Sequence, residues 1–189
     1  MSPTAWYVAR SSGLVAWALL AASVLWGLLL ATRVFDRTPS PKWFLDLHRF
    51  LGGTAVVFTA VHIGALAADT TVHFGWREIL VPLASRWRPV PVAFGVIALW
   101  ILLAVEITSL LMRFLPRRVW HAIHLSSFAL FFAATFHALS AGTDVHHQAF
   151  VLLCDAFLAV VLLLTLVRLA AGKRRAARPP AAPVGATRG

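Results

Sequence analysis

Charge and cysteine are both scarce in this chain. Of its 189 residues only 13% are charged, while 60% are apolar and eight are tryptophan. A soluble enzyme needs a polar shell that this composition does not supply, so that class is excluded. The one cysteine, Cys154, excludes an intramolecular disulfide, a zinc cluster of cysteines and a CxxCH motif for covalent haem. The composition therefore predicts an integral membrane protein.

Acidic residues are also few, seven against 17 Lys and Arg, and the formal net charge is +10. A positive charge is one mark of nucleic-acid binding, but here no soluble basic surface exists to carry it. On so apolar a chain, basic residues mark cytoplasmic loops and contacts with anionic lipid. We therefore expect the lipid bilayer as a partner and no nucleic acid.

Five apolar stretches have nearly the length that crosses a bilayer. They are residues 13–35, 50–68, 90–112, 119–141 and 149–171. They predict an all-α integral membrane protein, a bundle of five transmembrane helices. We expect residues 1–12 to form an N-terminal segment, 13–171 the transmembrane domain, and 172–189 a disordered basic tail. Residues 74–80 are expected to form a short amphipathic element on the membrane surface.

The basic residues divide unevenly between the two sides of this bundle. Thirteen Lys and Arg lie in the first and third connections and near the tail, and four lie on the other side. Those four are Arg10, Arg77, Arg86 and Arg88. The positive-inside rule then places the N-terminus outside and the C-terminus inside. The expected location is a cell membrane, that of a bacterium, with multiple spans.

Two pairs of histidines lie on the second and fourth spans. His48 and His62 are 14 residues apart, which is about 21 Å along a helix and within about 40° of one face. His124 and His137 are 13 residues apart, or about 19.5 Å. Because these two spans run parallel, His48 is predicted to face His124, and His62 to face His137. Thirteen residues fall about 140° short of four turns, so the fourth span must be locally distorted or approach its sites from different sides.

Imidazoles that face each other across an apolar bundle are the ligand set of a bis-histidine haem. Two such sites predict two non-covalent b-type haems, with iron held by His48 and His124 on the inner side and by His62 and His137 on the outer side. His121 competes with His124 for the inner site, and the sequence leaves that choice open.

Other polar residues near the histidines also suit this interpretation. Arg49, beside His48, is a candidate partner for a haem propionate, as are Arg77, Arg86 and Arg88 on the outer side. The hydroxyls of Thr59, Ser126 and Ser127 are candidate acceptors of a ring N–H, although bonding to their own helix is the alternative. Glu106, an acid inside an apolar run, is interpreted either as a proton relay or as the partner of an arginine such as Arg113.

The paired spacing, His-x13-His on one span and His-x12-His on the next but one, resembles the ferric reductase-like transmembrane domain. That domain is the membrane core shared by ferric reductases and NADPH oxidases. The resemblance covers about residues 35–168 and rests on Leu47-His48-Arg49-Phe50-Leu51-Gly52 through His62 and Arg117-Arg118-Val119-Trp120-His121-Ala122-Ile123-His124 through His137. It implies that these four histidines ligate two haems.

The arrangement Trp120-x-x-x-His124 also looks like the haem-binding membrane subunit of the periplasmic methionine sulfoxide reductase system. That relative lacks a histidine matching His48, so the presence of His48 favours the two-haem interpretation.

The larger ferric reductases continue into a flavin and NADPH domain, but this chain has no GxGxxG motif and no room for a βαβ unit. We therefore expect no flavin or NADPH site. The predicted function is a dihaem oxidoreductase subunit that takes electrons from a separate flavoprotein or quinol and reduces a small acceptor outside, such as a ferric chelate. The alternatives are a single-haem subunit of the methionine sulfoxide reductase kind and a non-redox transporter of metal ions or protons.

Overall fold

The computed structural model describes residues 3–32, 41–69, 74–142 and 147–176, and within these ranges it is helical without any strand. Its elements are α1 (Pro3–Thr32), α2 (Pro41–Ala68), α3 (Trp76–Leu80), α4 (Pro89–Leu110), the 3₁₀ turn η1 (Met112–Phe114), α5 (Arg117–Leu125), α6 (Ser127–Ala141) and α7 (Gln148–Ala176). Five helical segments are long and apolar enough to cross a membrane, with α5 and α6 together making the fourth. The predicted helical membrane architecture is confirmed.

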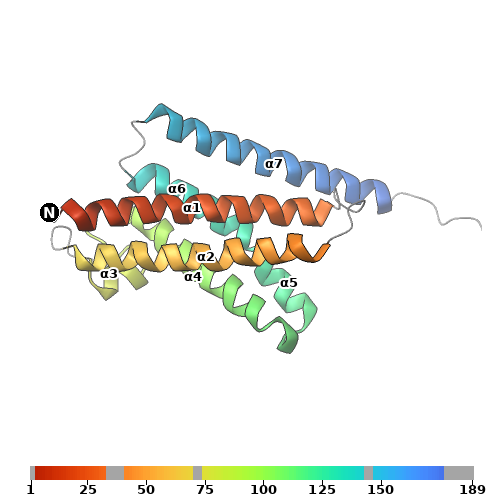
Figure 1. The fold of residues 1–189 in the computed structure, drawn as a ribbon, viewed down its shortest axis with the longest axis horizontal. Helices are drawn as coiled ribbons and strands as arrows, with labels where there is room; N and C mark the ends of the chain where they lie inside the picture. The colour runs from red at the N-terminus through yellow and green to blue at the C-terminus, as the bar shows by residue number, and fades with distance from the viewer. Residues whose placement is uncertain (1–2, 33–40, 70–73, 143–146, 177–189) are drawn as a thin grey trace, which may run out of the picture.

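α1 and α2 lie along one direction, and α4 and α7 are inclined to it (Figure 1). α1 and α2 are side by side and antiparallel, and α4 packs against α6 on the other side of the bundle. α7 crosses α1 at an angle at the edge. The start of α1, the end of α2, α3, the start of α4 and the end of α6 therefore meet at one end, which we call the N-terminal end.

Proline is the first residue of three of the long helices, α1, α2 and α4. α2 starts at Pro41 and α4 at Pro89, where the missing N–H and the preset φ suit a first helical turn. α1 starts at Pro3, well before the apolar stretch, because nothing in the intervening sequence stops a helix. The predicted N-terminal segment is thus largely part of α1. At the other terminus α7 continues to Ala176, and the rest of the expected tail lies outside the described residues.

Apolar side chains fill the centre of the bundle and also cover its outside. One buried cluster joins α1, α6 and α7 around Phe131, and another joins α4 and α6 around Leu102 and Leu130. Trp17 links α1 to α6, since its indole N–H donates to Thr135 Oγ1 at 3.0 Å. The outward surface carries many exposed leucines, among them Leu110, which is 80% exposed. Such a surface is suited to contact with lipid tails.

The segment of residues 74–88, between α2 and α4, folds over the N-terminal end of the bundle. Its helix α3 begins after Gly75, whose N–H donates to Glu78 Oε2 at 3.0 Å. Phe74 and Ile79 are buried against Val92 and other side chains of α4. The amphipathic element expected in this region is therefore packed onto the helices beneath it.

The fourth span is broken at Ser126, between its two histidines. The Ser126 N–H bonds to Ile123 O at 3.0 Å, and the Ser126 hydroxyl donates to the same carbonyl at 2.6 Å. This i to i−3 bond winds the chain more tightly than an α-helix does. The local distortion that the interval from His124 to His137 requires is thus present, and it separates α5, which carries His124, from α6, which carries His137.

Candidate functional site

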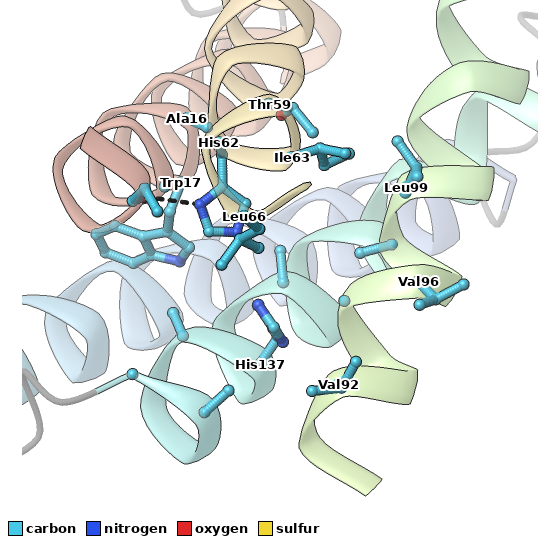
Figure 2. Close-up of a pocket in the computed structure, with 18 of the residues that line it drawn as sticks. Ala16, Trp17, Thr59, His62, Ile63, Leu66, Val92, Val96, Leu99 and His137 are labelled. Atoms are coloured by element: carbon cyan, nitrogen blue, oxygen red, sulfur yellow. Dashed lines mark hydrogen bonds between the residues drawn. The ribbon is translucent and has the colours of Figure 1, made fainter. Parts of the chain in front are cut away.

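The structure brings together the two histidine pairs that the spacing predicts. The ring centroids of His48 and His124 are 5.9 Å apart, and those of His62 and His137 are 6.4 Å apart. The interplanar angles are 73° and 78°. His62 and His137 reach from α2 and α6 into the same space (Figure 2). The bundle thus contains two separate sites, each with one imidazole from the second span and one from the fourth.

Backbone carbonyls hold both rings of the His62/His137 pair from behind. His62 Nδ1 lies 2.7 Å from Ala9 O of α1, and His137 Nδ1 lies 2.8 Å from Pro91 O of α4. A carbonyl oxygen only accepts, so Nδ1 carries the proton in both rings. In a neutral imidazole the lone pair is then on Nε2, the nitrogen free to bind a metal.

The His48/His124 pair is held in a related way. His48 Nδ1 lies 3.1 Å from Ser23 O and 3.2 Å from Ser23 Oγ. His124 Nδ1 lies 3.4 Å from Ser109 Oγ of α4, and the Trp120 indole stacks on the His124 ring with centroids 5.1 Å apart. Three of the four imidazoles therefore have a backbone carbonyl behind them, and the fourth has a hydroxyl.

The spacing of each pair suits one metal atom between two imidazoles. A metal–nitrogen bond is about 2 Å, and two such bonds on opposite sides of one atom put the ring centroids about 6 Å apart. In the described part of the chain no three His, Cys, Asp or Glu side chains come together as a metal site. A bare zinc ion takes about four ligands, whereas a haem iron needs only two from the protein. The residues of both pairs thus fit bis-histidine haem.

A cavity of about 240 Å³ surrounds the His62/His137 pair, between α1, α2, α4 and α6 and beneath α3. Apolar side chains such as Ile63, Leu66 and Val96 form most of its wall (Figure 2). Its charged lining residues are Arg10, Asp69 and Glu78, all near the N-terminal end. An apolar space with charged groups at one edge suits a flat macrocycle that carries carboxylates.

The arginine that lines this cavity is one that the sequence interpretation did not single out. Arg77, Arg86 and Arg88 are exposed and do not line the cavity. Arg88 Nη1 donates to Ser140 O at 2.7 Å, and its guanidinium lies 5.4 Å from the Trp87 ring centroid. Arg10 was missed because a cation in the first helix carries no motif, and only the packing of α1 against α2 brings it to the cavity.

The structure shows where the other candidate residues near the His48/His124 pair lie, namely His121 and Arg49. His124 faces His48, whereas His121 is exposed and lies beside Trp120. Arg49 is 61% exposed and lies 3.9 Å from Asp46 on its own helix. The geometry therefore favours His124 over His121 as the partner of His48.

Two of the three hydroxyls expected to fix the imidazoles, those of Thr59 and Ser126, bond instead to carbonyls of their own span. Thr59 Oγ1 donates to Ala55 O at 2.8 Å, and Ser126 Oγ to Ile123 O. The groups that hold the rings come from α1 and α4, and three of them are main-chain carbonyls. Residue type gives no signal for a main-chain acceptor, which is why the sequence did not identify them.

Glu106 and Arg113 are not paired with each other. The Glu106 carboxylate lies against α2 at Gly52, so closely that a Cβ at that position would overlap it. The guanidinium of Arg113 lies 4.5 Å from the Phe114 ring centroid. The ion-pair interpretation of Glu106 is therefore not supported by these contacts.

Comparisons with protein-family models, with curated proteins and with solved structures find no match to this chain.

Proposed function

We propose that this chain is a dihaem b-type electron-transfer subunit of a cell membrane, similar to the ferric reductase-like transmembrane domain. The observation that carries the proposal is how the four imidazoles are paired and hydrogen-bonded. They form two pairs with the ring spacing of one shared metal atom, and the carbonyls behind three of them leave Nε2 free to bind it.

The chain's own residues would hold and orient the cofactors. His48 and His124 ligate one haem iron, and His62 and His137 ligate the other. Each haem, when bound, accepts and releases one electron at its iron. An Nδ1–H bond to a carbonyl keeps the imidazoles of His48, His62 and His137 in the orientation and tautomer that iron ligation needs. The buried cluster of Ala98, Leu102, Leu130 and Ala133 in α4 and α6 keeps water out of the middle of the bundle.

The direction of transfer follows from the proposed orientation. Arg113, Arg117 and Arg118 lie exposed at the end of the bundle where α4 and α5 meet. The positive-inside rule places that end in the cytoplasm and the N-terminal end outside. A haem held by His48 and His124 would then take electrons from a separate flavoprotein or quinol. A haem held by His62 and His137 would pass them to a small acceptor outside, such as a ferric chelate.

The haem content of the purified protein tests this function. We expect a reduced-minus-oxidised spectrum with the sharp α band of b-type haem and a ratio of two haems per chain. Replacing His62 or His137 with Leu should remove one haem, and replacing His48 or His124 should remove the other. Protein purified after haem-supplemented expression serves as the reference for full loading.

Each alternative function has its own outcome in this experiment. One haem in the unaltered protein, insensitive to His48→Leu, would replace the proposal with a single-haem subunit of the methionine sulfoxide reductase kind. Absence of any haem spectrum would favour the remaining alternative, a non-redox transporter of metal ions or protons. Loss of a haem in His121→Ala but not in His124→Ala would show that the ligand is His121, about one helical turn before His124.

A further inference from the structure

Three glycines lie directly against the histidine rings. A Cβ built on Gly13 would be 2.8 Å from His62 Nδ1, and one on Gly95 would be 2.7 Å from His137 Nδ1. A Cβ on Gly27 would be 3.2 Å from His48 Cε1. Any other residue at Gly13 or Gly95 would therefore have to push the neighbouring ring away.

Each glycine stands four residues after the carbonyl that accepts from the same ring. His62 Nδ1 donates to Ala9 O, and its ring lies against Gly13. In the same way His48 bonds to Ser23 O and lies against Gly27. His137 bonds to Pro91 O and lies against Gly95. In an α-helix that carbonyl already accepts from the N–H of the residue four later, and its second lone pair is free. The ring can reach this lone pair only by lying over the side-chain position of that residue.

The spacing of these positions matches the spacing of the histidines. Gly13 and Gly27 are separated on α1 by the same interval as His48 and His62 on the antiparallel α2. On α4, Gly95 and Ser109 repeat that interval, and they contact His137 and His124. α1 and α4, which carry none of the proposed iron ligands, therefore present one supporting position to each of the four rings, at the same two depths.

We infer that Gly13, Gly27 and Gly95 are positioning residues for the histidines, each allowing a helix carbonyl to hold Nδ1–H of the ring that crosses it. This inference rests on the proposed function for its consequence at the iron. Ser109 takes the fourth position, where its hydroxyl replaces the carbonyl as the group beside Nδ1. Hydrogen bonding at Nδ1 makes Nε2 a stronger donor to the metal, which favours ferric iron and lowers the midpoint potential.

Alanine substitutions test the inference in the full-length protein. In Gly13→Ala and Gly95→Ala we expect the haem of the His62/His137 site either to be lost, reducing the ratio from two haems to one, or to titrate at a higher potential. In Gly27→Ala the change should be confined to the other haem and should be smaller, because the Cβ contact is longer. Redox titration by optical spectroscopy, with the low-spin ferric signal in electron paramagnetic resonance, separates the two haems.

Two other glycines of the same bundle are matched controls. Gly53 and Gly64 lie on α2, and a Cβ on either would meet nothing within 4 Å. Gly53→Ala and Gly64→Ala should leave both potentials unchanged. A glycine needed only for helix packing would change thermal stability without moving the potential of one haem, so wild-type potentials in all three test variants would overturn the inference.

A second measurement does not depend on haem. In haem-free protein labelled with ¹⁵N at histidine, the ring nitrogen shifts should report a protonated Nδ1 at His62, and Gly13→Ala should lose that signature while Gly64→Ala keeps it. An unchanged tautomer in Gly13→Ala would contradict the inference even if both haems bind. Loss of the signature in a protein that never binds haem would support the positioning role and reject the proposed function.

Discussion

The indole N–H of Trp120 is buried beside the His48/His124 pair and has no hydrogen-bond partner in the described chain. The same ring stacks on His124, with an angle of 25° between the planes. A buried donor that lacks an acceptor costs free energy unless a ligand satisfies it. A haem propionate at this site would supply a charged acceptor.

We therefore expect Trp120→Phe to weaken haem retention at the His48/His124 site. Phenylalanine keeps a ring against His124 but loses the N–H, and a hydrogen bond to a charged group is worth about 1.5 kcal/mol, or roughly a tenfold faster release. Haem transfer from the purified protein to apomyoglobin measures the rate. The control is Trp100→Phe, whose indole N–H donates to Leu80 O at 2.9 Å. Equal release from the two variants would mean that Trp120 only packs on His124.

At the scale of the element, the break at Ser126 decides which way α6 presents His137. A continuous helix across this interval would turn one histidine about 140° away from the other's face. The break resets that angle, and Pro91 O then holds the His137 ring from α4. The rotation of α6 about its own axis therefore affects the His62/His137 site, whereas the His48/His124 site depends on α5.

Inserting one alanine tests this dependence on phase. An alanine between Phe136 and His137 should rotate His137 by about 100° away from His62, and the ratio should fall from two haems to one. The matched control places the alanine between His137 and Ala138. It shifts the same four residues at the end of α6 and leaves His137 in register, so both haems should remain. Loss of both haems in the first variant, with neither lost in the control, would indicate that the sites are not independent.

At the scale of the whole molecule, the five spans and the uneven basic residues together predict opposite locations for the two termini. The cytoplasmic assignment of the Arg117 end determines which haem receives electrons first, so the orientation is part of the proposed function. In the proposed orientation, the charged edge of the cavity, with Arg10 and Glu78, would face the outside, where the proposed acceptor binds.

Reporter fusions test the orientation in cells. A fluorescent protein that folds only in the cytoplasm should be fluorescent when fused after Gly189, and alkaline phosphatase fused there should be inactive. A phosphatase fusion within the connection of residues 81–88 should show the opposite result. Active phosphatase after Gly189 would reverse the orientation and make the His62/His137 site the point of electron entry.

The number of spans and the two depths at which histidines face each other were evident in the sequence. Hydropathy alone marks a spanning helix, and the interval from His48 to His62 alone places both on one face at two depths. Parallel second and fourth spans then pair His62 with His137, and leave either His124 or His121 to face His48. A break in the fourth span was one of two possibilities that the sequence left, the other being an approach from different sides, because the interval from His124 to His137 does not return a regular helix to the same face.

The groups behind the rings were decided only by the tertiary structure. Ala9 O and Pro91 O are main-chain atoms that every residue has, so their role depends on where α1 and α4 pass the histidines. The role of Gly13 and Gly95 also depends on where α1 and α4 pass the histidines. The lack of a side chain matters there because an imidazole ring occupies the space that a side chain would fill. Packing between helices distant in sequence sets these contacts, and local residue preferences do not encode it.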